Sequence, residues 1–77
     1  MSAQQLVTFI ARSLVEEPDK VTVNSVERGR TVVLELRVAP GDMGRVIGRQ
    51  GRIANAIRAV LKSATANSRQ KYIVDIL

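Results

Sequence analysis

The first apolar residues of the chain recur at the spacing of one helix face. Within residues 3–16 they are Leu6, Val7, Phe9, Ile10 and Leu14. This spacing is typical of an amphipathic helix, so we expect Phe9 to face the core. Ser2 stands where a residue can cap the helix N-terminus. Pro18 ends the helix, because the residue before a proline is pushed out of the helical region.

Strict alternation replaces this spacing over residues 20–39. Residues 20–28 alternate and are rich in β-branched side chains, which favours a strand. The alternation is clearest over residues 31–39, where one face holds Val32, Leu34, Leu36 and Val38. Gly29-Arg30 lies between the two runs as a two-residue loop with glycine first, which favours a type II′ hairpin turn.

Helical spacing returns after Pro40. We expect Asp42 to cap a short helix through residue 47 and Gly48 to end it in the left-handed conformation. After Gly51 a longer helix runs to about residue 66, with one apolar stripe: Ile53, Ile57, Val60, Leu61 and Ala64. A final alternation begins near Tyr72, whose ring we expect on the core face, and continues with Val74 and Ile76 in a last strand.

The elements predict a single α+β domain over residues 1–77 with the order α-β-β-α-α-β. The first two strands form an antiparallel hairpin. The last strand returns after a helical crossover, so it runs parallel to the second. We therefore expect a three-stranded mixed sheet with three helices packed on one face.

Composition removes several kinds of chemistry from consideration. The chain has no cysteine and no histidine, so we expect no disulfide, no metal site, no cofactor and no catalytic residue. No signal sequence is visible, and no apolar run approaches the roughly 20 residues that span a bilayer. We expect a cytoplasmic protein without a membrane partner.

Charge is distributed unevenly along the chain. Residues 1–42 carry 5 Lys/Arg and 6 Asp/Glu, a net of −1, whereas residues 43–77 carry 7 Lys/Arg and 1 acid, a net of +6. A one-sided basic half points to a polyanionic partner such as nucleic acid. A solvated basic face that only aids solubility is the simpler alternative.

The segment Gly48-Arg49-Gln50-Gly51 lies between two apolar helical stretches. Glycine lets a ligand approach the main chain closely, and the amide groups that open the following helix attract phosphate. Candidate ligand contacts in and beside the loop are Gly48, Arg49, Gln50, Gly51, Arg52 and Arg45. A GxxG sequence alone is common in turns.

A groove for bases is predicted beside this loop. Val46, Ile47 and Ile53 flank the loop, and we expect the outer ends of their side chains to form an aliphatic floor. These residues also suit a plain core role, and the two roles are compatible. The far wall is expected from the second strand or the hairpin, with Arg37 and Arg30 on that side. Arg58 and Lys62 are expected on the solvated face of the long helix. Phe9 and Tyr72 are the only aromatic residues, which argues against a base-stacking platform.

The run from Val46 to Ile53 resembles the KH signature, in which two aliphatic residues precede GxxG and an isoleucine follows it. The order of elements resembles a type II KH domain. Residues 32–40 and 42–54 are similar to the small stand-alone bacterial KH proteins of the KhpA family, and the likeness extends over nearly the whole chain.

This resemblance implies a cytoplasmic protein that binds single-stranded RNA through a GxxG loop and acts as an RNA chaperone or post-transcriptional regulator. It implies Gly48, Arg49, Gln50 and Gly51 as the loop that contacts phosphates. It also implies pairing with a larger KH-containing protein of the KhpB kind, or with itself as a homodimer. Asn55 departs from the family pattern, in which a basic residue is expected there.

Three other functions remain open at this level. A phosphate-binding enzyme or nucleotide binder is disfavoured, because the loop lacks the Gly-Lys-Ser/Thr ending of a P-loop. A protein-interaction module with an inert GxxG loop is possible for a small domain with apolar helix faces. Single-stranded DNA is an alternative ligand, because discrimination depends on contacts to the 2′-hydroxyl.

Overall fold

The structure is a computed structural model that describes residues 1–77. Its order of elements confirms the sequence prediction. The helices and strands are α1 (Ala3–Leu14), β1 (Thr22–Arg28), β2 (Thr31–Arg37), α2 (Met43–Ile47), α3 (Arg52–Ala64) and β3 (Lys71–Ile76). Short 3₁₀ turns cover Pro18–Lys20, Pro40–Asp42 and Arg49–Gly51.

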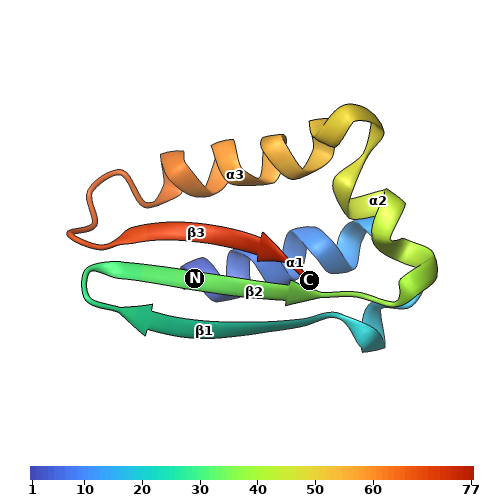
Figure 1. The fold of residues 1–77 in the computed structure, drawn as a ribbon, viewed down its shortest axis with the longest axis horizontal. Helices are drawn as coiled ribbons and strands as arrows, with labels where there is room; N and C mark the ends of the chain where they lie inside the picture. The colour runs from blue at the N-terminus through green and yellow to red at the C-terminus, as the bar shows by residue number, and fades with distance from the viewer.

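The sheet has the strand order β1-β2-β3 (Figure 1). β1 and β2 are antiparallel, and β2 and β3 are parallel, as predicted. The hairpin closes with Arg28 opposite Thr31. Gly29 has φ 63° and Arg30 does not have a positive φ, the pattern of the predicted type II′ turn. In the strand order β1-β2-β3, β2 is the central strand and β3 is an edge strand.

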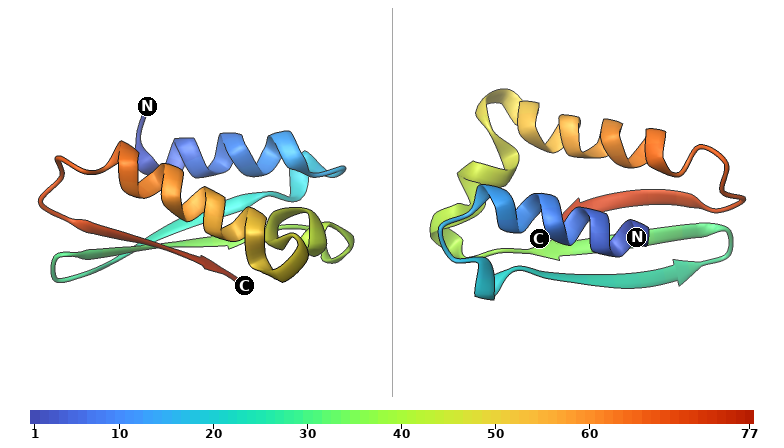
Figure 2. Two further views of the ribbon diagram at one scale, coloured as in Figure 1. Left: turned by 90° about the horizontal axis from the view of Figure 1, so that it is seen from above. Right: turned by 180° about the vertical axis from the view of Figure 1, so that it is seen from behind.

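The helices occupy one side of the sheet, which confirms the predicted α+β class. Figure 2 shows α1 and α3 side by side over the same face, with the short α2 beyond one end of the strands. The other sheet face is bare. The amide groups at the start of α1 are satisfied as the sequence suggests: Gln5 N–H donates to Ser2 Oγ over 3.1 Å, and Ser2 N–H donates to the Gln5 side chain over 2.8 Å.

The core lies between the sheet and these helices. Its buried residues follow alternation in the strand regions and helical spacing on the helices: Val7, Ala11, Val21, Val23, Val32, Leu34, Leu36, Val46, Ile57, Leu61 and Val74. Tyr72 packs half-buried against this core, which agrees with the core face predicted for it.

Four residues predicted on apolar stripes are exposed instead. Phe9 is 61% exposed and Val60 is 48% exposed, and Leu14 and Ala64 are also exposed. The sheet contact of α1 is centred on Val7 and Ala11, and Phe9 lies about 200° around the helix from Val7. Phe9, Leu14 and Val60 belong to what we call the α1–α3 surface, a largely apolar region between the two helices. Its other lining residues are Leu6, Ile10, Arg52, Ile53, Ala56 and Ile57.

Candidate nucleic-acid interface

The GxxG loop begins where α2 ends, at Gly48. The Gly48 N–H donates to Gly44 O over 2.9 Å, which closes the last turn of α2. Gly48 then has φ 75° and ψ 172°. We predicted the left-handed helical conformation here, and the positive φ agrees, but this ψ lies in the extended region that is essentially restricted to glycine. The chain therefore leaves α2 through a conformation that a residue with a side chain rarely adopts.

The next three residues form a tight turn that presents Arg49 and Gln50 to solvent. Gln50 has φ 57° and ψ 25°, and Gly51 has φ 75° and ψ 14°. Gln50 is the only non-glycine residue with a positive φ. The Gly51 N–H donates to Gly48 O over 3.2 Å and holds the turn closed. Both middle side chains are exposed, as a phosphate-contacting role requires.

The loop leads directly into the N-terminus of α3. Gly51 is the residue before the helix, and no side chain caps the first turn. Amide groups at an uncapped helix start attract anions. Arg52, on that first turn, is exposed. The loop thus combines close main-chain access, open amide groups and two free guanidinium groups, those of Arg49 and Arg52.

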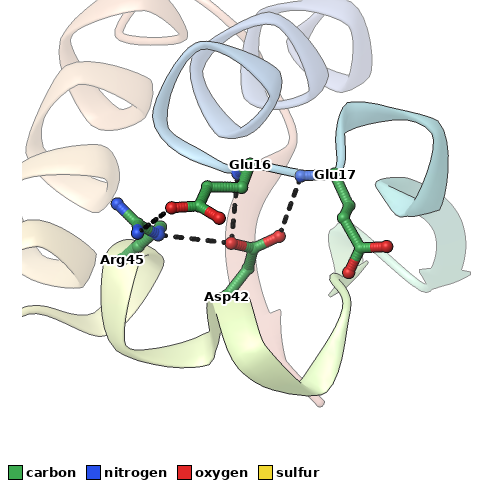
Figure 3. Close-up of polar contacts among 4 residues, drawn as sticks. All are labelled: Glu16, Glu17, Asp42 and Arg45. Atoms are coloured by element: carbon green, nitrogen blue, oxygen red, sulfur yellow. Dashed lines mark hydrogen bonds and ion pairs between the residues drawn. The ribbon is translucent and has the colours of Figure 1, made fainter.

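Arg45 was predicted to extend this basic rim, and the structure does not support that role. Its guanidinium Nη2 donates to Glu16 Oε1, and its Nε lies 3.3 Å from Asp42 Oδ1 (Figure 3). Two carboxylates thus surround its one positive charge. A cation paired in this way adds little to the positive electrostatic potential at the loop.

Asp42 also differs from its predicted role as a helix cap. Its side chain makes no cap hydrogen bond to α2. Instead Glu16 N–H donates to Asp42 Oδ1 and Glu17 N–H to Asp42 Oδ2, each over 3.1 Å (Figure 3). Asp42 is 3% exposed. The buried carboxylate therefore ties the segment after α1 to the start of α2, and so to the helix that leads into the loop.

The aliphatic residues around the loop divide into two groups. Val46 is fully buried, so its side chain belongs to the core and offers no surface to a ligand. Ile47 and Ile53 are half-buried and pack against the core with part of each side chain. Ile53 also lies on the α1–α3 surface. Only these two isoleucines can serve the aliphatic role predicted for the loop's flanks.

The structure has a groove, but it is a different one from the groove predicted beside the loop, because neither the loop residues 48–51 nor Val46, Ile47 and Ile53 line it. It lies between α3 and β3, with a volume of about 430 Å³, and neither β2 nor the hairpin tip contributes a wall. Its lining residues are Arg58, Leu61, Lys62, Thr65, Ala66, Ser68, Gln70, Lys71, Tyr72, Ile73 and Val74. Arg37 and Arg30 are not among them. α3 leads into β3 through a short connection, which is why the helix lies beside the edge strand and not beside β2.

Sequence reasoning missed the basic character of this groove. Arg58 and Lys62 were expected on a merely solvated face, yet both line the groove, and Lys71 joins them from β3. No acidic residue lines it. A signal was present in the sequence, because Arg58 and Lys62 are four positions apart and share one helix face. That face meets the strand that follows α3.

Arg58 reaches across the groove floor. Its Nε and Nη2 both donate to the main-chain oxygen of Val74, over 3.3 Å and 3.2 Å. Edge strands present main-chain groups that no neighbouring strand satisfies. Arg58 thus satisfies one of these groups and holds its guanidinium between helix and strand.

Other kinds of site are not found. No group of three or more His, Cys, Asp or Glu residues is placed to hold a metal ion. No helix of the structure has the length and apolar character needed to cross a bilayer.

Known proteins match nearly the whole chain. The KhpA/KhpB KH-domain model matches residues 4–76. The RNA-binding protein KhpA of Clostridium perfringens is 50% identical over 74 residues, which are 96% of this chain and 99% of that protein. The RNA-binding protein KhpA of Caldanaerobacter subterraneus is 48% identical over 73 residues, which are 95% of this chain and 97% of that protein.

A solved structure shares the fold. Era, crystallised in complex with MgGDPNP and a segment of 16S ribosomal RNA, superposes with a TM-score of 0.67 at 17% identity. The match covers 96% of this chain and 28% of the Era chain. At this identity the likeness concerns the fold alone.

Proposed function

This chain belongs to the KhpA/KhpB KH-domain family, and on that premise we propose that it binds single-stranded RNA and holds the phosphate backbone on its GxxG loop. KH domains bind single-stranded RNA in this way. The observation that carries the proposal is the exposed turn Gly48–Gly51, with Arg49 and Gln50 at its tip and an uncapped helix start behind it.

The proposed contacts follow from exposure and charge. Gly48, Arg49, Gln50, Gly51 and Arg52 contact phosphates, and the exposed parts of Ile47 and Ile53 contact ribose or base carbon. Arg45 is left out because two carboxylates surround it, and Val46 is left out because it is buried. The bases enter the α3–β3 groove, where Lys62 and Lys71 favour a polyanion.

In the cell we propose a role as an RNA chaperone or post-transcriptional regulator in the cytoplasm. A single KH loop clamps about four nucleotides, so a protein of this size fits a helper that acts on many RNAs. Cell fractionation and sequencing of RNAs crosslinked to the protein test this role. Recovery of no RNA above background would contradict it.

We also propose pairing with a larger KhpB-like protein or with a second copy. The exposed apolar side chains of the α1–α3 surface support a protein partner, because contiguous exposed apolar regions mark interaction sites. Sedimentation velocity of the pure protein, alone and mixed with a KhpB-like protein, tests the pairing.

The decisive experiment for RNA binding uses the double variant Arg49→Asp/Gln50→Asp. The new carboxylates face phosphates, so affinity for short single-stranded RNA should fall at least about tenfold. Fluorescence anisotropy measures this at low and at physiological salt, and circular dichroism checks the fold. Wild-type affinity should fall as salt rises, because each phosphate contact on a single strand releases about 0.7 counterions.

A matched control separates the loop from net charge. Thr22→Asp/Arg28→Asp changes the charge by the same amount on exposed positions of β1, and it should change affinity far less. Equal losses in both double variants would contradict a loop-specific site. Tighter binding of single-stranded DNA than of RNA would replace RNA as the ligand, and full retention of binding by the loop variant would favour a protein-interaction module.

A further inference from the structure

Arg58 is held in a way that a merely solvated arginine is not. Its Nε and Nη2 converge on one acceptor, the main-chain oxygen of Val74, over 3.3 Å and 3.2 Å. No carboxylate lines the groove around it. The guanidinium is therefore fixed in direction while its charge stays unpaired, unlike that of Arg45.

This anchoring leaves a defined set of donors. A guanidinium carries five N–H groups in a rigid plane, and the contact to Val74 uses the side of the plane that joins Nε and Nη2. The end of the plane, with Nη1 and the second Nη2 proton, remains free. Arg58 thus offers two parallel donors from a position already ordered by the strand, so little conformational entropy is lost on binding.

We propose that Arg58 is the specificity-determining residue of the α3–β3 groove and selects bases that present two adjacent acceptors. This inference rests on the RNA-binding function proposed above. Guanine presents O6 and N7 as such a pair, and cytosine presents O2 and N3. In adenine an amino donor lies beside each ring acceptor on its pairing edges, and in uracil N3–H lies between the two oxygens. In both bases one of the two Arg58 donors would therefore face another donor.

The flanking cations have a different task. Lys62 and Lys71 line the same groove, but a lysine ammonium is a compact charge without a planar fork. They attract the backbone of any RNA and contribute nothing to the choice of base. Arg58 is the one groove residue with a fixed pair of donors, so the choice of base depends on it.

The test compares base preference, not affinity alone. Short oligouridine RNAs carry a single adenine, cytosine or guanine at the centre, and fluorescence anisotropy gives the affinity for each. The wild type should bind the cytosine or guanine RNA about tenfold more tightly than the all-uridine RNA. Arg58→Lys keeps the charge and loses the fork, so this ratio should fall close to one.

Arg58→Gln is the sharper variant. A glutamine amide presents one donor and one acceptor, the pattern that pairs with adenine N6 and N7, so the preferred RNA should become the adenine one. A residue that only ties α3 to β3 would not produce a new preference. Lys62→Gln is the matched control, which should weaken all four RNAs by the same factor.

The outcomes distinguish failure of the role of Arg58 from failure of the proposed RNA binding. An unchanged order of base preference in Arg58→Lys, or equal affinities of the wild type for all four RNAs, overturns the role of Arg58 while RNA binding stands. If the wild type binds none of the RNAs, both proposals fail. Thermal unfolding of each variant shows whether α3 and β3 remain packed, and a folded Arg58→Gln that still prefers cytosine or guanine overturns the inference directly.

Discussion

Single residues decide which cations around the loop are free to meet an anion. Arg45, Arg49 and Arg52 look equivalent in the sequence, yet only Arg45 is paired, and its partner Glu16 lies 29 positions earlier in the chain. Local patterns predicted the loop and its glycines because those depend on adjacent residues. They did not predict the pair with Glu16, because it depends on how distant segments meet, whereas the pair with Asp42 joins residues three positions apart and was missed although its spacing is local.

Gly48 is the residue whose replacement we expect to be most costly in the loop. A Cβ there would lie 2.7 Å from Ile53 Cγ1 and 3.0 Å from Ile53 N, at a φ of 75°. Both the strained conformation and the clash with the helix start oppose it, so Gly48→Ala should destabilise the fold by about 1–3 kcal/mol. Urea denaturation followed by circular dichroism measures the change.

Gly44→Ala is the control at the same scale. A Cβ at Gly44 meets nothing within 4 Å, and alanine in a helix is favoured over glycine by about 0.5–1 kcal/mol. The two substitutions should therefore have opposite signs. Equal stabilities for Gly48→Ala and the wild type would show that the loop can adopt another conformation at residue 48 without loss of stability.

Elements were predicted well where the signal is periodic. The hairpin ends of β1 and β2 follow from alternation and from the glycine of the hairpin, while the opposite ends were each predicted two residues too far out. The parallel pairing of β3 follows from the helical crossover. The groove between α3 and β3 was not predicted, because apolar spacing shows which face of α3 is buried and not which strand runs beside its edge. Phe9 was misplaced for a related reason: periodicity finds a stripe but not its centre.

The contact between the end of α1 and the start of α2 depends on one buried carboxylate. Asp42 accepts hydrogen bonds from the amides of Glu16 and Glu17 and pairs with Arg45. Asp42→Asn has almost the same shape but leaves one amide facing an NH₂ group. We expect it to lower the free energy of unfolding by about 2–3 kcal/mol, measured by urea denaturation.

Glu16→Gln tests the other half of this cluster. It removes the charge that pairs with Arg45 but leaves the Glu16 amide in place. The Glu16 side chain is 72% exposed, and exposed ion pairs contribute about 0–1 kcal/mol. A loss in Glu16→Gln as large as that in Asp42→Asn would mean that the ion pair, and not the buried amide contacts, joins these elements.

At the scale of the whole molecule, the uneven charge of the sequence becomes a spatial separation. The basic half of the chain folds into α2, the loop, α3 and β3, which together build the loop and the groove. Glu16 and Asp42, from the other half, pair with Arg45, whereas Arg49 and Arg52 form no ion pair. The basic character of this part of the molecule was thus predictable from the sequence, while its shape required the fold.

The remaining large feature is the α1–α3 surface, which shares no lining residue with the groove and borders the loop through Arg52 and Ile53. Two copies related by a two-fold axis through it would each bury Phe9 against the partner. We expect the pure protein to sediment as a species heavier than its 8.4 kDa monomer, and Phe9→Ser to shift it toward the monomer at the same concentration. Loss of this aromatic ring from the interface should weaken pairing at least about tenfold.

Ile73→Ser is the matched control for this surface. Ile73 is 41% exposed and lies opposite Val33 on the bare face of the sheet, so its loss removes a comparable apolar group from a different side of the molecule. It should leave sedimentation unchanged. If Ile73→Ser dissociates the protein and Phe9→Ser does not, copies meet through their sheets. A wild type that stays monomeric at every concentration, yet sediments with a KhpB-like protein, would make that protein the partner and would show that the surface serves a mixed pair.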